Sequence, residues 1–571
     1  MLKRSPWLER APVRYARELL LLALCAVPLS AWLNLQYPIP ISEESHLRVA
    51  LEVPIAFVLL AVARRFEVQL KWWFFAIVSL LALLVRLFIT ADNVSHRFLF
   101  RDFRIPIDLH LVPEFFRLMY DTSPAKARVS YAALFVLVLI ASLLMVAALL
   151  RLVYRASDRT SFQRTLVAYV LLAAGLVAYQ ETAGGETALY TRQVSQRIQQ
   201  EVAMARKLPA ERKQILRTIK GVRERIGEGG PFLDKLHGTN VLFFFVESYG
   251  RTVFANENYS KRLLPIYEEM GKNLEAEGFH VVSDYLTSPT YGGFSWFAHD
   301  TLATGVKVIS HLHSQLLDEN RPKSFANYFR DAGYKPIFVA PGTSRPWPGM
   351  DDYYGFNNHY FSWEFGYKGP RYGWPTMADQ FVLYHVQKEE IEKTTQPLFI
   401  EYCLVSSHAP FSNQPRYVED WESIGDGSIL NKTGQNRFNV TWGLDGDVVN
   451  AYTSAITYDM HVMEGYLTNY VHDDTLVIFV GDHQPHQIVT GPDNLTWSVP
   501  IHIASRNADL VEPFVRRGFV AGMVPNQPLP HVGMERFMEQ FLSDFSTAPL
   551  AVDPGIWAPV KERLQKQAAT R

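Results

Sequence analysis

The chain has 571 residues, 48% of them hydrophobic, and a formal net charge of −1 at pH 7. This length exceeds that of one ordinary domain, and the near-neutral charge argues against general nucleic-acid binding. Only two cysteines are present, Cys25 and Cys403. A disulfide-rich scaffold is therefore excluded.

Apolar runs are concentrated in the first third of the chain. Five occur in succession, and with their flanks they approach the roughly 20 residues that a membrane-spanning helix needs. They are Leu19–Leu35, Val49–Ala63, Trp72–Ile89, Ala132–Leu150 and Leu166–Tyr179. We therefore expect residues 1–184 to form a five-helix transmembrane domain.

Lysine and arginine residues near the ends of these runs indicate the orientation. With a cytoplasmic N-terminus, twelve basic residues fall in cytoplasmic segments and seven in outer loops. Because cytoplasmic segments carry the basic excess in membrane proteins, this orientation is favoured. Five spans then place the rest of the chain outside the cytoplasm. We expect a multi-pass protein of the inner (cytoplasmic) membrane with an extracytoplasmic or periplasmic C-terminal domain.

Two charged residues interrupt the apolar runs, Glu52 and Arg86. Both lie near the outer ends of their spans, and intramembrane charges usually face a partner or a polar cavity. A Glu52–Arg86 pair is the simpler interpretation, and a lipid-headgroup site is the alternative. The outer loop from His96 to Tyr120 alternates aromatic and basic residues, as an interfacial segment does.

A polar segment follows the last span. Residues 185–235 are rich in Glu, Gln, Lys and Arg and predict a helical connector, which Pro209 is expected to interrupt. The sequence GEGGP at 227–231 ends this pattern. Residues 236–571 then form the predicted third part of the chain.

Short apolar runs alternate with amphipathic stretches in this last part. The runs are continuous, which is typical of strands buried on both faces in a largely parallel sheet between helices. The predicted strands are Asn240–Val246, Val281–Tyr285, Lys335–Ala340, Leu398–Val405, Thr475–Val480 and Val499–Ser505. The predicted helices are Ser260–Glu277, Lys323–Ala332, Ala378–Glu392 and Val448–Tyr470.

Polar residues follow three of these strands directly. Glu247 follows the first, Ser406-Ser407-His408 the fourth, and Gly481-Asp482-His483 the fifth. Chemistry in such sheets gathers beyond the carboxyl ends of the strands. Acidic groups that converge there repel one another unless a cation lies between them. A divalent metal site is therefore predicted.

Ser295 lies in the stretch PTYGGFSWFAHDTLATG, at the start of a short helix that Gly305 closes. Two interpretations are open. Serine is a common helix N-cap. Alternatively, Gly292 and Gly293 permit close approach, and the helix start favours negative charge on a nucleophilic serine oxygen. With Glu247, Asp482 and His483, Ser295 completes a set of oxygen and nitrogen donors without thiolate. One divalent ion is expected, manganese rather than zinc or magnesium.

Four motifs in this order resemble the alkaline phosphatase and sulfatase superfamily. NVLFFFVESYG is similar to its first metal-binding strand, FSWFAHDTLATG to its nucleophile region, LVSSHAPF to its active-site histidine loop and VIFVGDHQPH to its late Asp-His pair. Five spans before such a domain look most like lipoteichoic acid synthases and related phosphoglycerol or phosphoethanolamine transferases. The resemblance implies a sulfatase-like α/β domain outside the cytoplasm, with Ser295 as nucleophile.

Three departures from the superfamily pattern narrow the expected nucleophile chemistry, the number of metal ions and the transferred group. Phe297 and His299 occupy positions where sulfatases that modify their nucleophile carry a small residue or proline and then arginine, so formylglycine is not expected. Leu404 replaces the aspartate that two-metal members carry four residues before the histidine matching His408, which favours one metal. The lack of disulfides favours phosphoglycerol transfer over phosphoethanolamine transfer.

The implied reaction has two displacements. Ser295 attacks a phospholipid headgroup phosphodiester and releases diacylglycerol, and a hydroxyl of a glycan or lipid acceptor then displaces the serine. His408 holds a nonbridging oxygen or acts as acid and base, and His486 assists from nearby. The aromatic segment 342–381 supplies the candidate substrate contacts Arg345, Trp374 and Asp379. A membrane-anchored phosphodiesterase and a noncatalytic receptor or scaffold remain alternatives.

Overall fold

The structure is a computed structural model of the full chain. It describes residues 11–35, 48–99, 101–113, 116–117, 120, 128–183, 189–227, 229–343, 353–372, 377–440, 447–491, 496–526 and 528–550. The chain divides into two compact units. The first contains residues 1–97 and 101–208, and the second contains residues 98–100 and 209–571. The predicted three-part division, with a separate connector, stays a prediction.

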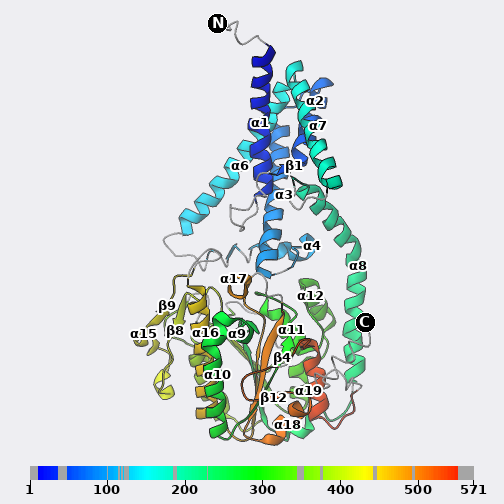
Figure 1. The fold of residues 1–571 in the computed structure, drawn as a ribbon. Coiled ribbons are helices and arrows are strands. Elements are labelled where there is room, and N and C mark those ends of the chain that lie inside the picture. Colours follow the sequence, from blue (N-terminus) through cyan, green and yellow to red (C-terminus); the bar gives the residue numbers. More distant parts are fainter. Residues whose placement is uncertain are drawn as a thin grey trace. The chain divides into compact units, whose positions relative to one another are not determined.

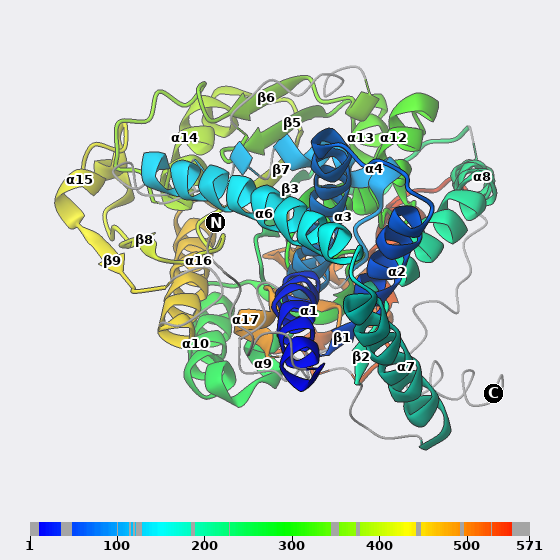
Figure 2. The same cartoon turned by 90° about the horizontal axis from the view of Figure 1, so that it is seen from above.

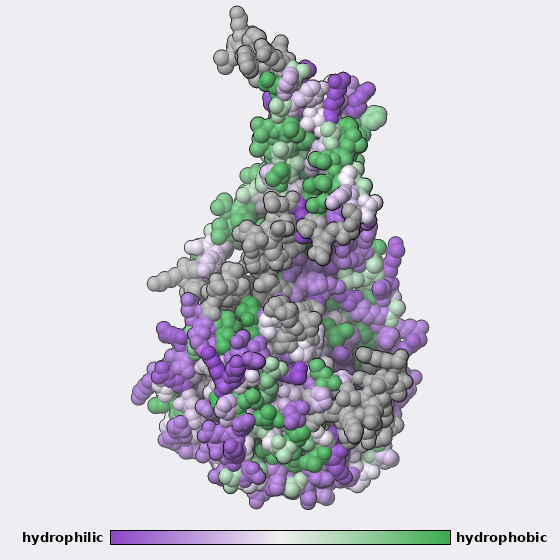
Figure 3. Space-filling view, in the orientation of Figure 1, coloured by the Kyte–Doolittle hydropathy of each residue, from purple (hydrophilic) through white to green (hydrophobic). Residues whose placement is uncertain are grey.

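The first unit is helical (Figure 1). Its main helices are α1 (Ala11–Asn34), α2 (Glu52–Arg65), α3 (Trp72–Leu99), α6 (Arg128–Ala156) and α7 (Thr160–Ala183). Among the described residues, all of these except α2 are long and apolar enough to cross a membrane. Figure 3 shows hydrophobic side chains on the surface of these helices, and Leu20, Leu81 and Leu137 are each more than half exposed. Exposed apolar side chains on such helices suit lipid, and the protein is a multi-pass membrane protein.

The second predicted span differs most from the structure. Val49 and Ala50 form strand β1, and α2 has only 14 residues, which is about 21 Å of helix. β1 pairs with β2 (Tyr190–Thr191), which follows α7. At its other end, α2 carries Arg64, which pairs with Asp158 just before α7. α2 thus runs between the same two ends as α7, although it is shorter than the helices that could cross a membrane. The number of crossings stays a prediction.

The two charged residues inside the apolar runs do not form the expected pair. Glu52 Oε1 accepts hydrogen bonds from the backbone N–H groups of Val194 (3.1 Å) and Ser195 (3.2 Å), at the start of α8 (Gln193–Ile226). The Arg86 guanidinium instead donates to the carbonyl of Leu35. The Glu52 carboxylate therefore satisfies N–H groups that have no partner within the helix.

Helix α8 also corrects the prediction for the connector, because Pro209 lies inside the helix and does not end it. Proline removes one backbone hydrogen bond, and the many charged side chains of α8 leave its surface open to water, which can satisfy the freed carbonyl. The helix ends at Ile226, where Gly227 adopts a φ of 80° and donates to the Arg223 carbonyl (2.9 Å). This end matches the predicted break at GEGGP.

The second unit is built on a nine-stranded sheet. The strand order is β12 (Val520–Ala521), β4 (His280–Thr287), β11 (Ser498–Ser505), β10 (Thr475–Gly481), β3 (Asn240–Val246), β7 (Leu398–Leu404), β5 (Lys335–Ala340) and β6 (Asn358–Phe361), and β13 (Val532–Gly533) also pairs with β4. Neighbours from β10 to β6 are parallel, whereas β11 is antiparallel to both β10 and β4. The predicted largely parallel sheet is confirmed.

Helices cover both faces of this sheet (Figures 1 and 2). Alternate residues of β3 face opposite layers. Phe244 packs in a core with α10 (Glu257–Ala276), α14 (Asp379–Glu389) and α16 (Val448–Tyr470). Phe243 contacts Phe537 of α19 (Phe537–Phe545) on the other face, where α11 (Ser295–Thr304), α13 (Phe325–Asp331) and α18 (Ala508–Arg516) also lie. The continuous apolar runs of the sequence thus form strands that are buried on both faces, as this pattern predicts.

Candidate active site

Three neighbouring parallel strands deliver the polar residues of the site. Glu247 follows β3, Asp482 follows β10 and His408 lies just beyond β7. Because β10, β3 and β7 are adjacent and parallel, their carboxyl ends meet at one edge of the sheet. The buried side chains of Glu247, Asp482 and His483 offer ligand atoms that all lie within 4.8 Å of one another. This cluster is a candidate metal site.

Ser295 is the first residue of α11 and does not cap it. The N-cap position belongs to Phe294, in left-handed conformation (φ 57°), and its side chain makes no capping hydrogen bond. The Ser295 hydroxyl instead donates to Glu247 Oε2 (2.9 Å), and its oxygen lies 3.2 Å from His483 Nε2. The N-cap interpretation is therefore wrong.

The loop before α11 has the geometry that its glycines suggest. Gly292 and Gly293 adopt positive φ values of 69° and 152°, which side chains disfavour. The N–H of Gly292 donates to the Gln484 carbonyl (2.9 Å), and Tyr291 bridges to Gln484 in parallel fashion. The nucleophile loop is thus tied directly to the segment that carries Asp482 and His483.

Hydrogen bonds hold the side chains of the cluster. Both Glu247 oxygens accept one, Oε1 from the Ser248 hydroxyl (2.9 Å) and Oε2 from the serine hydroxyl described above (2.9 Å). Asp482 Oδ1 accepts from the N–H groups of Ser248 (2.8 Å) and His483 (2.6 Å), which leaves Oδ2. His483 Nδ1 lies 2.8 Å from the Gln484 carbonyl and donates to it, so the Nε2 lone pair points to the cluster. His483 Nε2 lies 3.4 Å from Glu247 Oε1 and 3.6 Å from Asp482 Oδ2.

These separations fit a shared divalent cation. Ligand atoms about 2.1 Å from one four-coordinate ion lie about 3.4 Å from each other. The donor set of carboxylates, hydroxyl and imidazole, with the second atoms of Asp482 and His483 already bonded, is that of a supported metal centre. The residues present therefore fit a divalent cation, and its identity stays a prediction.

The electrostatics of the cluster show the same need for positive charge. Burial and the Glu247 carboxylate raise the pKa of Asp482 well above its ordinary value. Burial acts in the same direction on Glu247, but the His408 and His483 imidazoles hold the pKa of Glu247 below its usual range. Although burial opposes it, Asp482 and Glu247 raise the pKa of His483 to about 9. The two buried carboxylates and the imidazole thus shift one another's pKa values, and a shared cation would relieve this repulsion.

Two further histidines lie at the site. His408 is half-buried, and its Nδ1 is 2.5 Å from the carbonyl of Ala409. His486 is buried, and burial together with His408 and His483 lowers its pKa to about 4. His486 is therefore neutral at pH 7.

Of the three predicted substrate contacts, the structure describes only Asp379. Arg345 and Trp374 lie outside the described residues. Asp379 is fully buried, and its carboxylate accepts from the N–H groups of Val405 (3.0 Å) and Ser406 (2.7 Å). Its prediction as a substrate contact is wrong because both oxygens are already used to hold the start of the His408 loop.

Several residues hold the side chains of the site in place, and the sequence did not indicate this role for them. The Gln484 carbonyl bonds to both the nucleophile loop and His483, and the Ser407 hydroxyl donates to the Glu247 carbonyl (2.6 Å). Burial and the neighbouring Asp379 raise the pKa of the buried Asp459 carboxyl well above its usual value. Ser407 and Gln484 stand beside recognised residues, but nothing in their spacing indicates their partners.

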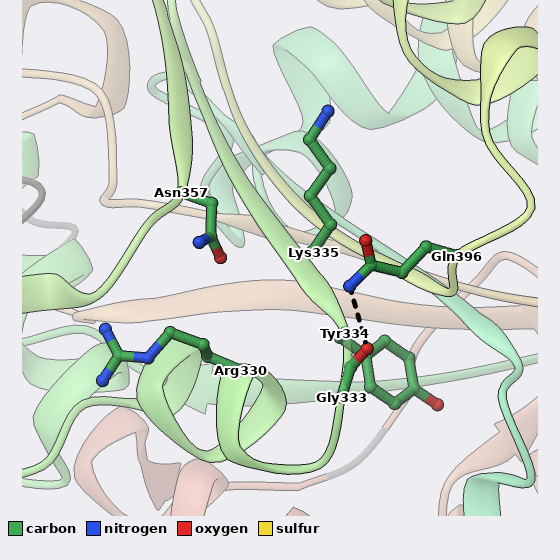
Figure 4. A pocket seen from close by; sticks show the side chains of 6 residues that line it. All are labelled: Arg330, Gly333, Tyr334, Lys335, Asn357 and Gln396. Atoms are coloured by element: carbon green, nitrogen blue, oxygen red, sulfur yellow. Dashed lines mark hydrogen bonds between the residues drawn. The ribbon is translucent and has the colours of Figure 1, made fainter.

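A pocket of about 370 Å³ lies elsewhere, at the amino end of β5. Figure 4 shows its lining, in which the Gln396 amide donates to the Gly333 carbonyl (3.1 Å) and the Arg330 and Lys335 side chains point away from each other. This is the edge of the sheet opposite the cluster. In parallel α/β sheets chemistry gathers at the carboxyl ends, so this pocket is not the active site.

The sulfatase family model matches residues 240–497, which include every residue of the cluster. A search of curated protein sequences gave no match. Among solved structures, the chain is similar to the lipoteichoic acid synthase LtaP from Listeria monocytogenes, with 14% identity, a TM-score of 0.35, and 60% of this chain and 81% of that chain covered. It is also similar to the Streptococcus pyogenes phosphoglycerol transferase GacH, with 12% identity, a TM-score of 0.35, and coverage of 63% and 90%.

The integral membrane phosphoethanolamine transferase EptA from Neisseria meningitidis is similar over most of its length, with 12% identity, a TM-score of 0.44, and coverage of 93% of this chain and 96% of that chain. The family match and the four motifs agree on the same residues of the second unit. Residues 240–497 therefore form a sulfatase-family domain, in a chain whose described residues also include four helices long and apolar enough to cross a membrane.

Proposed function

We propose that the protein is a metal-dependent phosphotransferase that moves a phosphoglycerol or phosphoethanolamine headgroup from a phospholipid to an extracytoplasmic glycan or lipid, through a covalent intermediate on Ser295. The observation that carries this proposal is the position of the Ser295 hydroxyl. It leaves the helix cap unused and lies 2.9 Å from Glu247 and 3.2 Å from His483.

The chain's own residues support nucleophilic attack at Ser295. Glu247 accepts the serine proton in the hydrogen bond seen here, which directs an oxygen lone pair away from the carboxylate. In the first displacement, a bond forms between Ser295 Oγ and phosphorus while the bond to the diacylglycerol oxygen breaks. In the second, the acceptor hydroxyl forms its bond to phosphorus, and the serine oxygen leaves. The net reaction moves one headgroup phosphate and one proton between two alcohols.

Glu247, Ser295, Asp482 and His483 would hold the cation, which supplies positive charge for the serine oxygen and the phosphate. The donor set without thiolate favours manganese over zinc or magnesium. His408 is half-buried beside Glu247 and has its Nδ1 occupied by the Ala409 carbonyl. Its Nε2 side is thus oriented to hold a phosphate oxygen or to protonate the departing diacylglycerol oxygen. His486, neutral at pH 7, supports His408.

The membrane helices favour a lipid donor over a soluble one. Four helices among the described residues are long and apolar enough to span a bilayer, and they would tether the catalytic domain to a membrane. The basic residues near the span ends favour the outer face of the inner membrane for this domain. Phe297 and His299 follow Ser295 in place of the residues needed for a modified sulfatase nucleophile, which favours phosphate esters over sulfate esters.

The direct test uses purified full-length protein in vesicles that contain phosphatidylglycerol or phosphatidylethanolamine, with Mn²⁺ added. We expect diacylglycerol release and a mass increase equal to one headgroup phosphate on the wild type. The Ser295→Ala variant should show neither. A matched control is Ser314→Ala, because Ser314 also donates to a carboxylate at 2.9 Å, that of Asp300, outside the cluster. Diacylglycerol release at the wild-type rate from Ser295→Ala would exclude the covalent route.

The same residues suit a membrane-anchored phosphodiesterase, in which water replaces the acceptor alcohol. The serine adduct distinguishes the two. If its decay is fast in vesicles without acceptor and unchanged by added glycan or lipid alcohol, the protein is a hydrolase. If decay requires the alcohol and yields a new phosphodiester, it is a transferase. A noncatalytic receptor predicts no adduct with either donor.

A further inference from the structure

A second cluster of ligand-type side chains lies under α11, one helical turn beyond Ser295. His299 belongs to α11, and Glu401 and Cys403 belong to β7. Their ligand atoms all lie within 4.8 Å of one another. We propose that His299, Glu401 and Cys403 form a second metal site, for a thiophilic divalent cation such as zinc, separate from the site at Ser295.

The fold explains why these three residues meet. Glu401 and Cys403 are two residues apart on β7, so their side chains point to the same face of the sheet. In register they lie beside Phe243 and Phe245 of β3. The ring of His299 stacks on Phe245 with centroids 3.8 Å apart, which brings its Nδ1 over the β7 pair. The imidazole is therefore fixed in place by an aromatic contact that no catalytic role requires.

The distances are those of metal ligands. His299 Nδ1 lies 3.5 Å from Cys403 Sγ and 3.5 Å from Glu401 Oε1. For a nitrogen–oxygen hydrogen bond, 3.5 Å is beyond the normal range of about 2.7 to 3.2 Å. Donors bound tetrahedrally to one zinc ion, at about 2.1 Å for nitrogen and oxygen and 2.3 Å for sulfur, are separated by about 3.4 to 3.6 Å. The two separations from His299 Nδ1 thus match those of ligands that share one ion.

The chemistry of the set selects the type of ion. A thiol, an imidazole and a carboxylate together favour zinc or cobalt, whereas magnesium, calcium and manganese prefer oxygen donors. Binding displaces the thiol proton of Cys403 to solvent, and the sulfur bonds to the ion as thiolate. The side chain of Glu401 is only 6% exposed and that of His299 14%, and Cys403 as a whole residue is intermediate in exposure. A bound ion would fasten α11, and with it Ser295, to β7.

Cobalt distinguishes the two sites, because the Ser295 cluster contains no sulfur. Full-length protein in detergent is stripped with a chelator and titrated with Co²⁺. We expect two ions per chain and a thiolate-to-cobalt charge-transfer absorption in the near ultraviolet. Cys403→Ser should abolish this absorption and lose one ion, whereas Cys25→Ser, the matched control in α1, should keep both. Glu247→Ala should lose the other ion and retain the absorption.

A wild type without the charge-transfer absorption, or a Cys403→Ser variant that keeps it, overturns the proposal. Because substitution in a buried strand can impair folding, a second measurement uses the Cys25→Ser protein with Cys403 intact. Zn²⁺ should slow alkylation of Cys403 by at least about tenfold, since a metal-bound thiolate is a poor nucleophile. An unchanged alkylation rate refutes the site. Neither result depends on phosphotransfer, so this proposal and the proposed function fail independently.

Discussion

Replacing Ser295 by alanine separates a chemical role from a structural one. The hydroxyl makes one hydrogen bond to the Glu247 carboxylate and one contact to His483, and it caps no helix. Loss of a hydrogen bond to a charged group costs about 1.5 to 3 kcal/mol of unfolding free energy at most. Part of that cost is recovered here because the carboxylate sits among other donors.

The effect on turnover should be far larger. Removal of an attacking group typically costs about 10⁴-fold or more in kcat, which corresponds to about 5.5 kcal/mol of activation free energy. We therefore expect diacylglycerol release to fall by at least this factor while the thermal midpoint of Ser295→Ala stays close to that of Ser314→Ala. Ser295→Thr retains a hydroxyl and should keep partial activity.

The assay follows diacylglycerol release from phosphatidylglycerol vesicles, together with intact-mass analysis of the protein and a melting curve for each variant. Two results would refute the reasoning. One is a Ser295→Ala protein whose activity falls only in proportion to its stability. The other is an equal loss of activity in Ser314→Ala, which would trace the effect to the loss of any buried hydroxyl–carboxylate bond.

The remaining predictions concern the metal, the topology and pH. Glu247→Ala and Asp482→Ala should each lower metal occupancy, measured by elemental analysis, without unfolding the nine-stranded sheet, and unchanged occupancy in both would contradict the proposed ligand set. A reporter fused after residue 571 should be active only outside the cytoplasm, and one inserted after Glu67, between α2 and α3, only inside it; the same compartment for both would rule out the five-crossing topology. Burial lowers the pKa of His502 from 6.5 to about 3, so the unfolded state binds its proton first and stability is lost as pH falls below 6.5. Between pH 7 and pH 5 this loss should be about 2 kcal/mol in urea unfolding, and His502→Gln should reduce the dependence; an equal slope in both proteins would show that other groups cause it.

Much of the fold was readable from local sequence. The run NVLFFFV predicts β3 to the residue, and Val448–Tyr470 predicts α16, because continuous apolar strands and amphipathic helices carry their own periodic signal. The polar residues that follow such strands indicated Glu247, Asp482 and His483, since a parallel sheet places its carboxyl ends together. The catalytic roles of these residues stay predictions until they are tested.

What the sequence did not contain was the set of contacts between distant segments. The order β10–β3–β7 brings Asp482, Glu247 and His408 side by side, although 161 residues separate Glu247 from His408. Long-range packing also explains two wrong expectations. Asp379 was expected to contact substrate, but it binds backbone N–H groups of the His408 loop. Glu52 was expected to pair with Arg86, but it accepts hydrogen bonds from the start of α8.

Ser295 shows the distinction most clearly. Its sequence context by itself favours an N-cap but also suits a nucleophile, because both roles call for a small hydroxyl residue at a helix start. The left-handed conformation of Phe294 moved the cap position back by one residue and turned the Ser295 hydroxyl toward Glu247. Local sequence determined that a helix begins at this serine. Only the tertiary structure decided what the hydroxyl contacts, because its partners come from strands far away in the chain.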